Sequence, residues 1–209
     1  PLATTKQRFL EYYRNEAGLW EWQVFTKARP VAGDLQFGEE LLTEVYRAMK
    51  QQGPPEELAP EIRNMRRRIE ENTRVPRNAL CDLKRGPGGL VDIEFLVQYL
   101  QLEHLGEAEK LFPLTTEQAL EEFSRRGTIE EDDRNFLLDH LRLLRIVQRG
   151  LRVLYETNND YLPASEEKRE ALHRGLKDQL ILMGMDYFDE LLPNMHHTRE
   201  LFEKYLRSE

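Results

Sequence analysis

The residues best suited to chemistry lie together in residues 82–95, where basic side chains, a glycine–proline turn and acidic side chains follow one another. Lys84 and Arg85 come directly before the turn, which spans residues 86–89. Glycines let a backbone approach another group closely, and the free N–H groups at a helix N-terminus attract anions. Two cations at such a helix end predict a seat for a phosphate. The stretch is not a P-loop, because the lysine–serine or lysine–threonine ending of that motif is missing.

Two carboxylates in the same stretch argue against a simple phosphate site. Asp92 and Glu94 fall in the first turn of the helix that should follow. They would repel a lone phosphate, but they suit a site in which they orient Lys84, Arg85 or a bound cation. The alternative is a structural turn in which Asp92 caps the helix and both basic side chains are solvated.

A second basic pair, Lys27 and Arg29, lies in residues 26–34. In one interpretation these cations close the preceding helix, where they complement its dipole. In the other, both side chains point into a cleft that they share with Lys84 and Arg85.

A local excess of positive charge covers residues 61–85. This window holds eight basic and four acidic side chains, so it carries +4 inside a chain of −8. Such a patch can recruit an anionic ligand or an acidic partner surface. The alternative is a solvated helix with ion pairs between residues four apart, such as Arg66–Glu70 and Arg67–Glu71.

Other reactive residue types lack the neighbours that chemistry needs. His196 and His197 are adjacent and do not share a helix face, while His140 and His173 have no evident co-ligands. Cys81 is the single cysteine, so it cannot form an internal disulfide, and it has no recognisable catalytic context. The sequence therefore predicts no metal site.

The elements that position these residues are predicted to be helices, because strand signals are almost absent. Apolar spacing predicts a first helix over residues 6–28, and Asp34 fits the N-cap of a second helix that reaches Gln52. A basic helix should cover about residues 60–73. A helix over about residues 91–105 is apolar on several faces, so we expect it in the middle of a bundle.

The second half of the chain continues this pattern after an irregular stretch at residues 74–89. Thr115 and Thr128 each begin a capping box, and Ser165 fits an N-cap. The helix expected after Thr128 carries a stripe of apolar residues at helical spacing: Leu137, Leu141, Leu144, Val147, Leu151 and Leu154. A terminal helix is expected over residues 194–206. The sequence therefore predicts an all-α bundle of about seven helices, with a glycine- and proline-rich loop before the central helix.

Composition excludes several classes of protein. The chain has 209 residues with 30 Lys and Arg against 38 Asp and Glu, a formal net charge of −8. Its longest uncharged stretches have eight residues, whereas a membrane helix needs about twenty apolar ones. The acidic balance argues against nucleic-acid binding. No signal peptide is visible, and a single cysteine fits a reducing compartment. The start at Pro1, without an initiator methionine, suggests a fragment of a longer protein.

Two stretches together resemble the bacterial bifunctional glutamine synthetase adenylyltransferase/adenylyl-removing enzyme. One is Leu19-Trp20-Glu21-Trp22-Gln23 with residues 27–34, and the other is residues 82–100. Their order and separation are also similar to that family, and the resemblance is strong over residues 1–105. The shorter core Lys-x-x-Pro-Gly-Gly-Leu-x-Asp, which begins at Lys84, is also similar to a segment of the related PII uridylyltransferase.

The resemblance implies a helical domain that follows a polymerase-β-like nucleotidyltransferase domain. Residues 1–5 would be the remnant of that upstream domain, and residues 6–209 the helical bundle, with a possible sub-boundary near residues 106–114. The family attaches AMP from ATP to a tyrosine of glutamine synthetase and removes it by phosphorolysis. The carboxylates that hold Mg²⁺ would lie upstream, so we expect no catalytic residue here and no transferase activity from the chain alone.

The resemblance also implies a role for the basic stretches. Residues expected near the ATP triphosphate or the cleft between domains, or fixing the cations there, are Lys27, Arg29, Lys84, Arg85, Gly88, Gly89, Asp92 and Glu94. ATP and Mg²⁺ would serve the whole enzyme, and neither is expected to bind tightly to this chain.

The partners that the resemblance implies are the upstream domain, glutamine synthetase and the PII signal protein, in the cytoplasm, with no nucleic acid and no membrane. The alternative function is a protein-interaction module that docks glutamine synthetase, PII or the other half of the enzyme without nucleotide contact. The long leucine-striped helix and the acidic second half favour that alternative. The stretch at residues 19–23 is more similar to the C-terminal, adenylylating half of the family.

Overall fold

The chain forms a helical bundle with one small pair of strands, so the all-α prediction is confirmed. The structure, a computed structural model, describes residues 4–184 and 188–206. Its α-helices are α1 (Lys6–Asn15), α2 (Leu19–Phe25), α3 (Leu35–Gln52), α4 (Leu58–Glu71), α5 (Leu90–Glu103), α6 (Ala108–Leu111), α7 (Thr116–Arg125), α8 (Glu131–Tyr155), α9 (Glu166–Leu182) and α10 (Leu191–Tyr205). Two short 3₁₀ segments are η1 (Leu105–Glu107) and η2 (Phe188–Glu190). None of these helices is both long and apolar enough to cross a bilayer.

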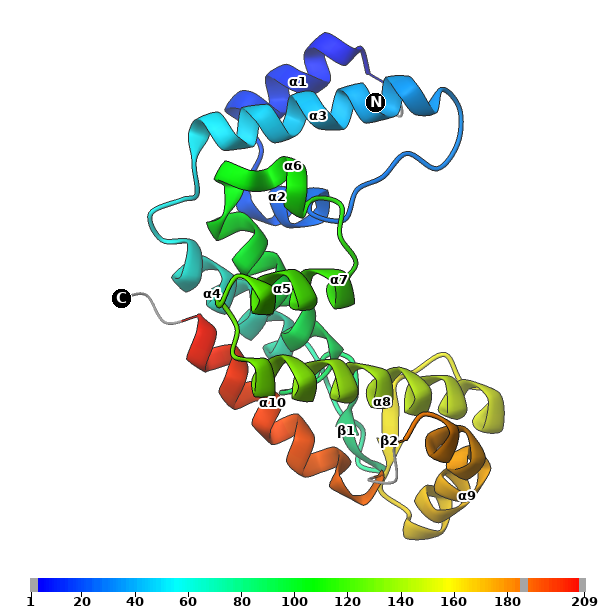
Figure 1. Ribbon diagram of the computed structural model, residues 1–209. Coiled ribbons are helices and arrows are strands. Elements are labelled where there is room, and N and C mark those ends of the chain that lie inside the picture. The colour runs from blue at the N-terminus through cyan, green and yellow to red at the C-terminus, as the bar shows by residue number, and fades with distance from the viewer. Residues whose placement is uncertain (1–3, 185–187, 207–209) are drawn as a thin grey trace.

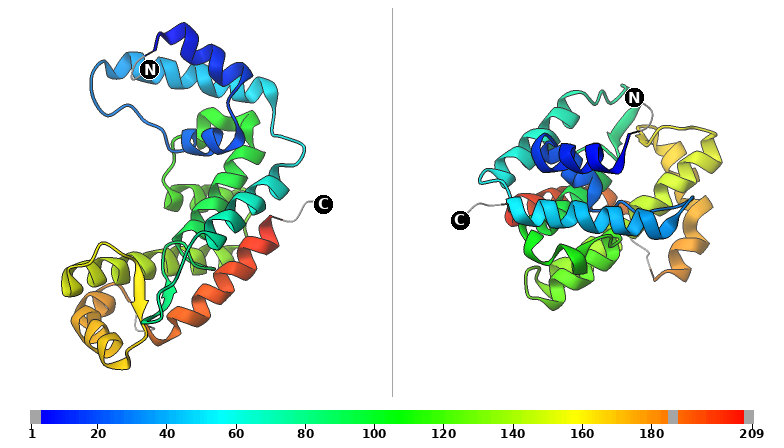
Figure 2. Two further views of the ribbon diagram at one scale, coloured as in Figure 1. Left: turned by 180° about the vertical axis from the view of Figure 1, so that it is seen from behind. Right: turned by 90° about the horizontal axis from the view of Figure 1, so that it is seen from above.

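The helices form an elongated stack around α5. Figure 1 shows α1 and α3 packed along each other at one end and α9 at the opposite end, and Figure 2 confirms this from two further sides. Helix α5 contacts α2, α4, α7, α8 and α10. Ten of its fourteen residues are buried, which confirms the expectation of a central helix. The loop that precedes α5 is therefore held in the interior of the bundle at one end.

The first predicted helix is wrong in its length, because the chain breaks between α1 and α2. Gly18 takes an extended conformation as the N-cap of α2, and its N–H donates to Glu21 Oε2 at 2.8 Å. The side chain of Glu21 thus caps the start of a new helix at Gly18, although the continuous apolar spacing predicts one helix through this point. This break, together with η1 and α6, divides the described chain into more segments than the expected seven helices.

A pair of short antiparallel strands was not predicted. Strand β1 (Ala79–Asp82) pairs with β2 (Tyr161–Pro163), and Cys81 lies opposite Leu162. Four and three residues are too few for an alternating pattern to be visible in the sequence. The pair ties the stretch before α5 to the segment that follows α8.

Most predicted helix starts are confirmed. The side chains of Asp34, Thr115 and Ser165 each accept the expected backbone N–H at the start of α3, α7 and α9. Thr128 does not cap α8, because the N-cap of that helix is Glu130. The N–H of Thr128 instead closes α7 by donating to Phe123 O at 2.9 Å. Helix α10 begins at Leu191 rather than at residue 194. Proline is tolerated in a first helical turn, and Pro193 lies there.

Candidate functional site

The loop before α5 is anchored by a group of four charged side chains, two buried and two partly exposed, which we call the charge quartet: Arg66, Glu70, Asp92 and Arg199. Arg66 and Asp92 are paired through Nε and Oδ1, and both side chains are almost fully buried, at 1% and 0% exposure. Arg66 Nη1 lies 3.1 Å from Glu70 Oε1, Arg199 Nη1 lies 3.2 Å from Asp92 Oδ2, and Arg199 also pairs with Glu70. The two positive and two negative charges compensate one another, as buried charges require.

The charge quartet directly holds the backbone of the loop between β1 and α5, residues 83–89, which we call the basic loop. Arg66 Nη2 donates to the carbonyl oxygens of Arg85 and Gly86 at 2.8 and 2.9 Å. The N–H of Gly88 donates to Asp92 Oδ2 at 2.7 Å. A guanidinium from α4 and a carboxylate from α5 therefore fix both sides of the turn, and α10 joins them through Arg199.

Asp82 fixes the start of the same loop. Its Oδ1 accepts the backbone N–H groups of Lys84 and Arg85, both at 2.8 Å. The side chains of Lys84 and Arg85 are exposed to solvent. Neither side chain forms an ion pair or hydrogen bond within the described part of the chain. The loop thus presents two solvated cations on a rigid backbone.

Gly88 is the point of closest backbone approach. It has a φ of 72°, and a Cβ built on it would lie 1.6 Å from the carbonyl oxygen of Met195 in α10. Gly89 is also confined, though less tightly, since its Cβ would lie 2.6 Å from Leu83 O. The expectation that glycines allow a close approach is correct here, but the group approached is the protein's own backbone.

The alternative of a structural turn holds only in part: Lys84 and Arg85 are solvated as it expects, but Asp92 is not the N-cap of α5. The N-cap of α5 is Gly89, and Asp92 lies inside the helix with its carboxylate fully enclosed by the charge quartet. The interpretation of Arg66–Glu70 as a solvated pair is also wrong, because Arg66 is buried. The Arg67–Glu71 pair is solvated as expected, because both side chains are more than 60% exposed. Arg67 Nε lies 3.8 Å from Glu71 Oε1.

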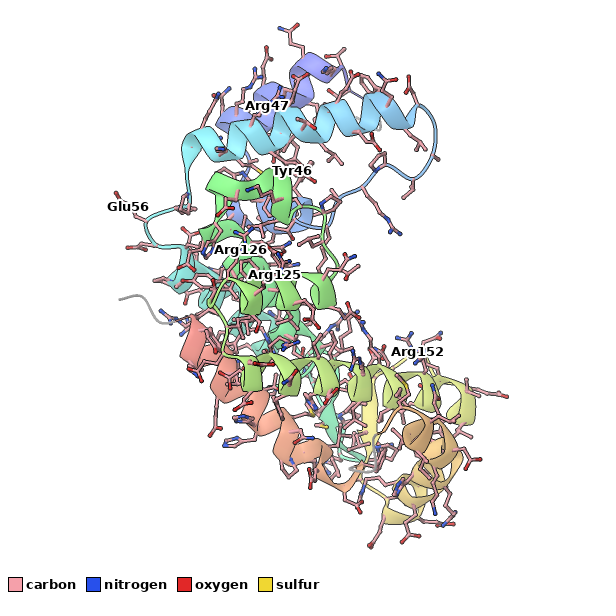
Figure 3. All side chains as sticks on the ribbon, viewed as in Figure 1. Tyr46, Arg47, Glu56, Arg125, Arg126 and Arg152 are labelled. Atoms are coloured by element: carbon pink, nitrogen blue, oxygen red, sulfur yellow. The ribbon has the colours of Figure 1, made fainter. Side chains whose placement is uncertain are left out.

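A second group of predicted residues lines a cavity of about 360 Å³ beside α5. The segment after α2, the start of α7 and the middle of α8 supply its walls, and these elements lie on one side of the molecule (Figure 3). The lining residues are Lys27, Arg29, Glu94, Pro113, Leu114, Thr115, Thr116, Glu117 and Arg145. We call it the basic cavity, since three cations face two carboxylates.

The carboxylates of the basic cavity pair with two of its cations. Lys27 Nζ lies 3.5 Å from Glu94 Oε1, and Arg145 pairs with Glu117. Burial raises the pKa of Glu117, but its own backbone N–H and Arg145 outweigh burial and hold that pKa below its usual value. Arg29 is exposed and has no carboxylate within ion-pair distance in the described residues. The cavity therefore has one uncompensated cation at its rim.

The predicted residues are thus divided between two places along α5. Lys27, Arg29 and Glu94 meet in the basic cavity, whereas the other predicted residues belong to the loop: Lys84, Arg85, Gly88, Gly89 and Asp92. Glu94 follows Gly89 by five residues, which is about 7 Å along a helix axis. A single cleft shared by all four cations stays a prediction.

Three arginines of these two places were not predicted as site residues. Arg145 lies on the side of α8 away from its leucine stripe, where an arginine is ordinary, so no local pattern singles it out. Arg66 had been placed on a solvated helix face. Arg199 lies more than one hundred residues from its partner Asp92, so no local pattern could connect them.

Two other reactive side chains, those of His140 and Cys81, are held in their uncharged forms at neutral pH. Burial lowers the pKa of His140 to about 4, and the nearby backbone of Gly88 offsets only part of that shift. Neither ring nitrogen of His140 has a hydrogen-bond partner among the described residues. Burial and the charge of Asp82 raise the pKa of Cys81 to about 11, so its thiol stays protonated. In the part of the chain that the structure describes, no three metal-ligating side chains cluster.

Comparison with known proteins shows which family the chain is similar to. A family model described as GlnD PII-uridylyltransferase matches residues 57–206. The chain is 36% identical over 179 residues to a bifunctional glutamine synthetase adenylyltransferase/adenylyl-removing enzyme of Streptomyces coelicolor, covering 84% of this chain and 18% of that protein. It is 34% identical over 168 residues to the protein of the same name from Mycobacterium tuberculosis, covering 80% of this chain and 17% of that protein. The chain therefore spans about a fifth of the length of these relatives.

Proposed function

Because the chain belongs to the GlnD PII-uridylyltransferase family and resembles, within it, the bifunctional glutamine synthetase adenylyltransferase/adenylyl-removing enzymes, we propose that it is a helical accessory domain of such an enzyme. In this proposal it helps to position the polyphosphate of ATP and closes the nucleotidyl-transfer site against the catalytic domain. The reaction served is the addition or removal of AMP on a tyrosine of glutamine synthetase. Glutamine synthetase and the PII signal protein are the partners proposed for the whole enzyme.

The convergence of Lys27, Arg29 and Arg145 on the basic cavity carries the proposal. Transfer of a phosphoryl or nucleotidyl group is assisted mainly by cations held where negative charge develops. Arginine is especially suited, because its planar group binds two phosphate oxygens at once. Three cations from three separate elements around one cavity fit the triphosphate of a nucleotide.

The carboxylates of the basic cavity are compatible with this role. Glu94 and Glu117 hold Lys27 and Arg145 in position without ligand. A triphosphate carries more negative charge than either carboxylate, so it can take over these cations when it binds. Arg29, which has no such carboxylate, is the residue we expect to meet the ligand first.

The basic loop, at the N-terminal end of α5, supports the same function. Its backbone is fixed by the charge quartet and Asp82, so Lys84 and Arg85 are presented at a defined position. Preorganised charges act more strongly than mobile ones because they need no rearrangement. We propose that this loop faces the catalytic domain or the nucleotide it holds.

Magnesium chemistry is assigned to the rest of the enzyme. Mg²⁺ requires carboxylate and phosphate oxygens in an octahedral arrangement, and the described residues bring no such cluster together. The residues present therefore fit the phosphates of ATP and not its metal ion.

Titration of MgATP into the 209-residue chain, followed by backbone amide NMR, tests the proposal. Shifts should centre on residues 27–29, 115–117 and Arg145, and Arg29→Ala and Arg145→Ala should each weaken binding about tenfold, the loss of one charge-assisted phosphate contact. Arg67→Ala is the matched control, since Arg67 is exposed and lies outside the basic cavity.

Two outcomes contradict the proposal. If millimolar MgATP causes no shifts in the basic cavity, the chain has no nucleotide site of its own. If binding occurs but Arg29→Ala and Arg145→Ala bind as tightly as Arg67→Ala, the cations of the basic cavity do not serve it. In either case a docking role without nucleotide contact becomes the better function.

A further inference from the structure

Helix α8 carries a row of arginines on one outward face, which we call the arginine face: Arg142, Arg145, Arg149 and Arg152. Their spacings of three, four and three residues place all four on one side of a helix. The row spans ten residues, about 15 Å of helix axis. Figure 3 shows Arg152 pointing away from α8. A row of this kind on a chain of −8 needs an explanation.

The positive charge of the arginine face is only partly compensated. Arg142 lies 3.0 Å from Asp139, Arg145 pairs with Glu117, and Arg152 lies 3.1 Å from Asp160. Arg149 is exposed, and no carboxylate of the described residues lies within ion-pair distance of it. Four cations thus meet three carboxylates, which leaves a small positive excess.

Exposed apolar side chains border the arginine face. Val153 follows Arg149 by four residues, so it lies on the same side of α8, and it is 77% exposed. The end of α9 adds Leu182, which is 86% exposed, and Met183, which is 46% exposed. Single exposed apolar side chains are common on any protein, so it is the position of Val153 and Met183 beside a row of cations that points to a protein partner.

The packing of α8 against α9 brings the two features together. A Cβ on Gly150 would lie 2.8 Å from Leu176, so the helices approach closely there. Met183 then lines a cavity of about 470 Å³ with the arginines themselves and with Ile146. Arginine and methionine are both enriched where proteins bind each other.

We propose that the arginine face, with Val153 and Met183, binds an acidic protein surface. Carboxylates of the partner pair with Arg149 and its neighbours, and an apolar side chain of the partner packs against Val153 and Met183. This surface shares Arg145 with the basic cavity, but Arg149, Arg152, Val153 and Met183 do not line that cavity, so the inference can be tested apart from nucleotide binding.

The charge balance favours a protein over a nucleic acid or a membrane. Binding to DNA or RNA depends on a large local excess of cations that displaces counterions, and this surface has four arginines against three carboxylates. No aromatic side chain interleaves with the arginines to stack on bases. Binding to an anionic lipid surface needs a broad apolar face or a denser basic cluster.

A labelled helical peptide tests the inference, with three glutamates along one face and a phenylalanine between them. Its binding to the 209-residue chain is measured by fluorescence anisotropy. We expect saturable, salt-sensitive binding that weakens about tenfold with Arg149→Glu and severalfold with Val153→Ser. A peptide with glutamine for each glutamate should bind at least tenfold more weakly. Arg67→Glu is the matched control, because it reverses one exposed charge outside this surface.

Several results overturn the inference. They are absence of peptide binding, equal binding by the Arg149→Glu and Arg67→Glu variants, or tighter binding to single-stranded DNA or phosphatidylglycerol vesicles than to the peptide. A concentration-dependent dimer that Arg149→Glu dissolves would assign the surface to a second copy instead. MgATP binding should be unchanged in Arg149→Glu and Val153→Ser, so failure here is distinguishable from failure of the proposed function.

Discussion

Asp92 shows how much of the site depends on one side chain. Its two oxygens contact Arg66, Arg199 and the N–H of Gly88, so they connect α4, α10 and the basic loop. A carboxylate without exposure can stay charged only because these partners replace water. From the sequence alone the residue is compatible with an ordinary cap, and only the tertiary fold distinguishes the two roles.

Asp92→Asn should destabilise the fold strongly. The amide keeps the shape of the side chain but removes the charge, which leaves two arginines facing Glu70 alone. Breaking a buried ion pair in this way costs about 3–5 kcal/mol. Urea unfolding followed by circular dichroism gives the change in the free energy of unfolding.

Glu94→Gln is the control for Asp92→Asn, because it changes a half-exposed carboxylate on the same helix. A pair at the surface contributes about 0–1 kcal/mol. Equal effects of the two substitutions would show that Asp92 is not held by a buried charge network.

His140 should make stability depend on pH. Its folded-state pKa is about 4, against about 6.5 in an unfolded chain. The unfolded state therefore binds more protons between these values, so the contribution is full above pH 6.5 and is lost as the pH falls toward 4. Between pH 7 and pH 5 the loss is about 2 kcal/mol.

His140→Phe should remove this dependence while keeping a ring stacked on Phe136. Relative to the unmodified protein, the variant should gain about 2 kcal/mol of unfolding free energy from pH 7 to pH 5. His196→Gln, at an exposed position, should show no such gain. Parallel pH profiles for His140→Phe and the unmodified protein would contradict the assignment.

At the scale of elements, the loop before α5 and the helix α10 form one unit. Gly88 leaves no room for a side chain against Met195 O, and its φ of 72° already favours glycine. Arg199 of α10 reaches Asp92 from the same side. Any displacement of α10 would therefore change the backbone of the loop that carries Lys84 and Arg85.

A comparison of Gly88→Ala with Gly33→Ala should separate the cost of a steric clash from the cost of the left-handed backbone conformation. Gly33 has a similar φ of 78° but nothing within 4 Å of its Cβ position. Gly33→Ala should cost about 1 kcal/mol for the left-handed conformation alone. Gly88→Ala should cost at least about 3 kcal/mol, because α10 must also move. Equal losses in thermal or urea unfolding would show that α10 does not press on the loop.

The sequence predicts elements better than it predicts their contacts. Helices α3, α4, α5 and α9 are found within about two residues, because caps and apolar spacing are local signals. The break at Gly18 has a local cause in Glu21, but the continuous apolar spacing hides it, whereas the pairing of β1 with β2 depends on contacts that no local pattern shows. The same holds for the site: Lys27, Arg29 and Glu94 are recognisable as candidates, but Arg145 and Arg199 join it only through the fold.

At the scale of the whole molecule, the basic cavity and the arginine face adjoin each other, because Arg145 lines both. Each has one more cation than it has carboxylates, on a chain whose net charge is −8. A local excess of positive charge orients an approaching anion or acidic partner before contact.

The 209-residue chain should not transfer AMP from MgATP to glutamine synthetase. Activation of the attacking hydroxyl needs carboxylate-held Mg²⁺, and the described residues provide no such cluster. Transfer of labelled AMP measures this, with the full-length enzyme as the positive control. Labelling above the rate without protein would show that the chain carries a catalytic centre of its own.

The contact of α10 with the basic loop also affects the order in which parts of the molecule can fold. Arg199 follows Asp92 by 107 residues, and Met195 follows Gly88 by a similar interval. Contacts between residues so distant form late, because a long stretch of chain must first be closed. During synthesis the loop leaves the ribosome long before α10 exists. The surface that presents Lys84 and Arg85 therefore reaches its final geometry among the last parts of the domain, after the helices between them have formed.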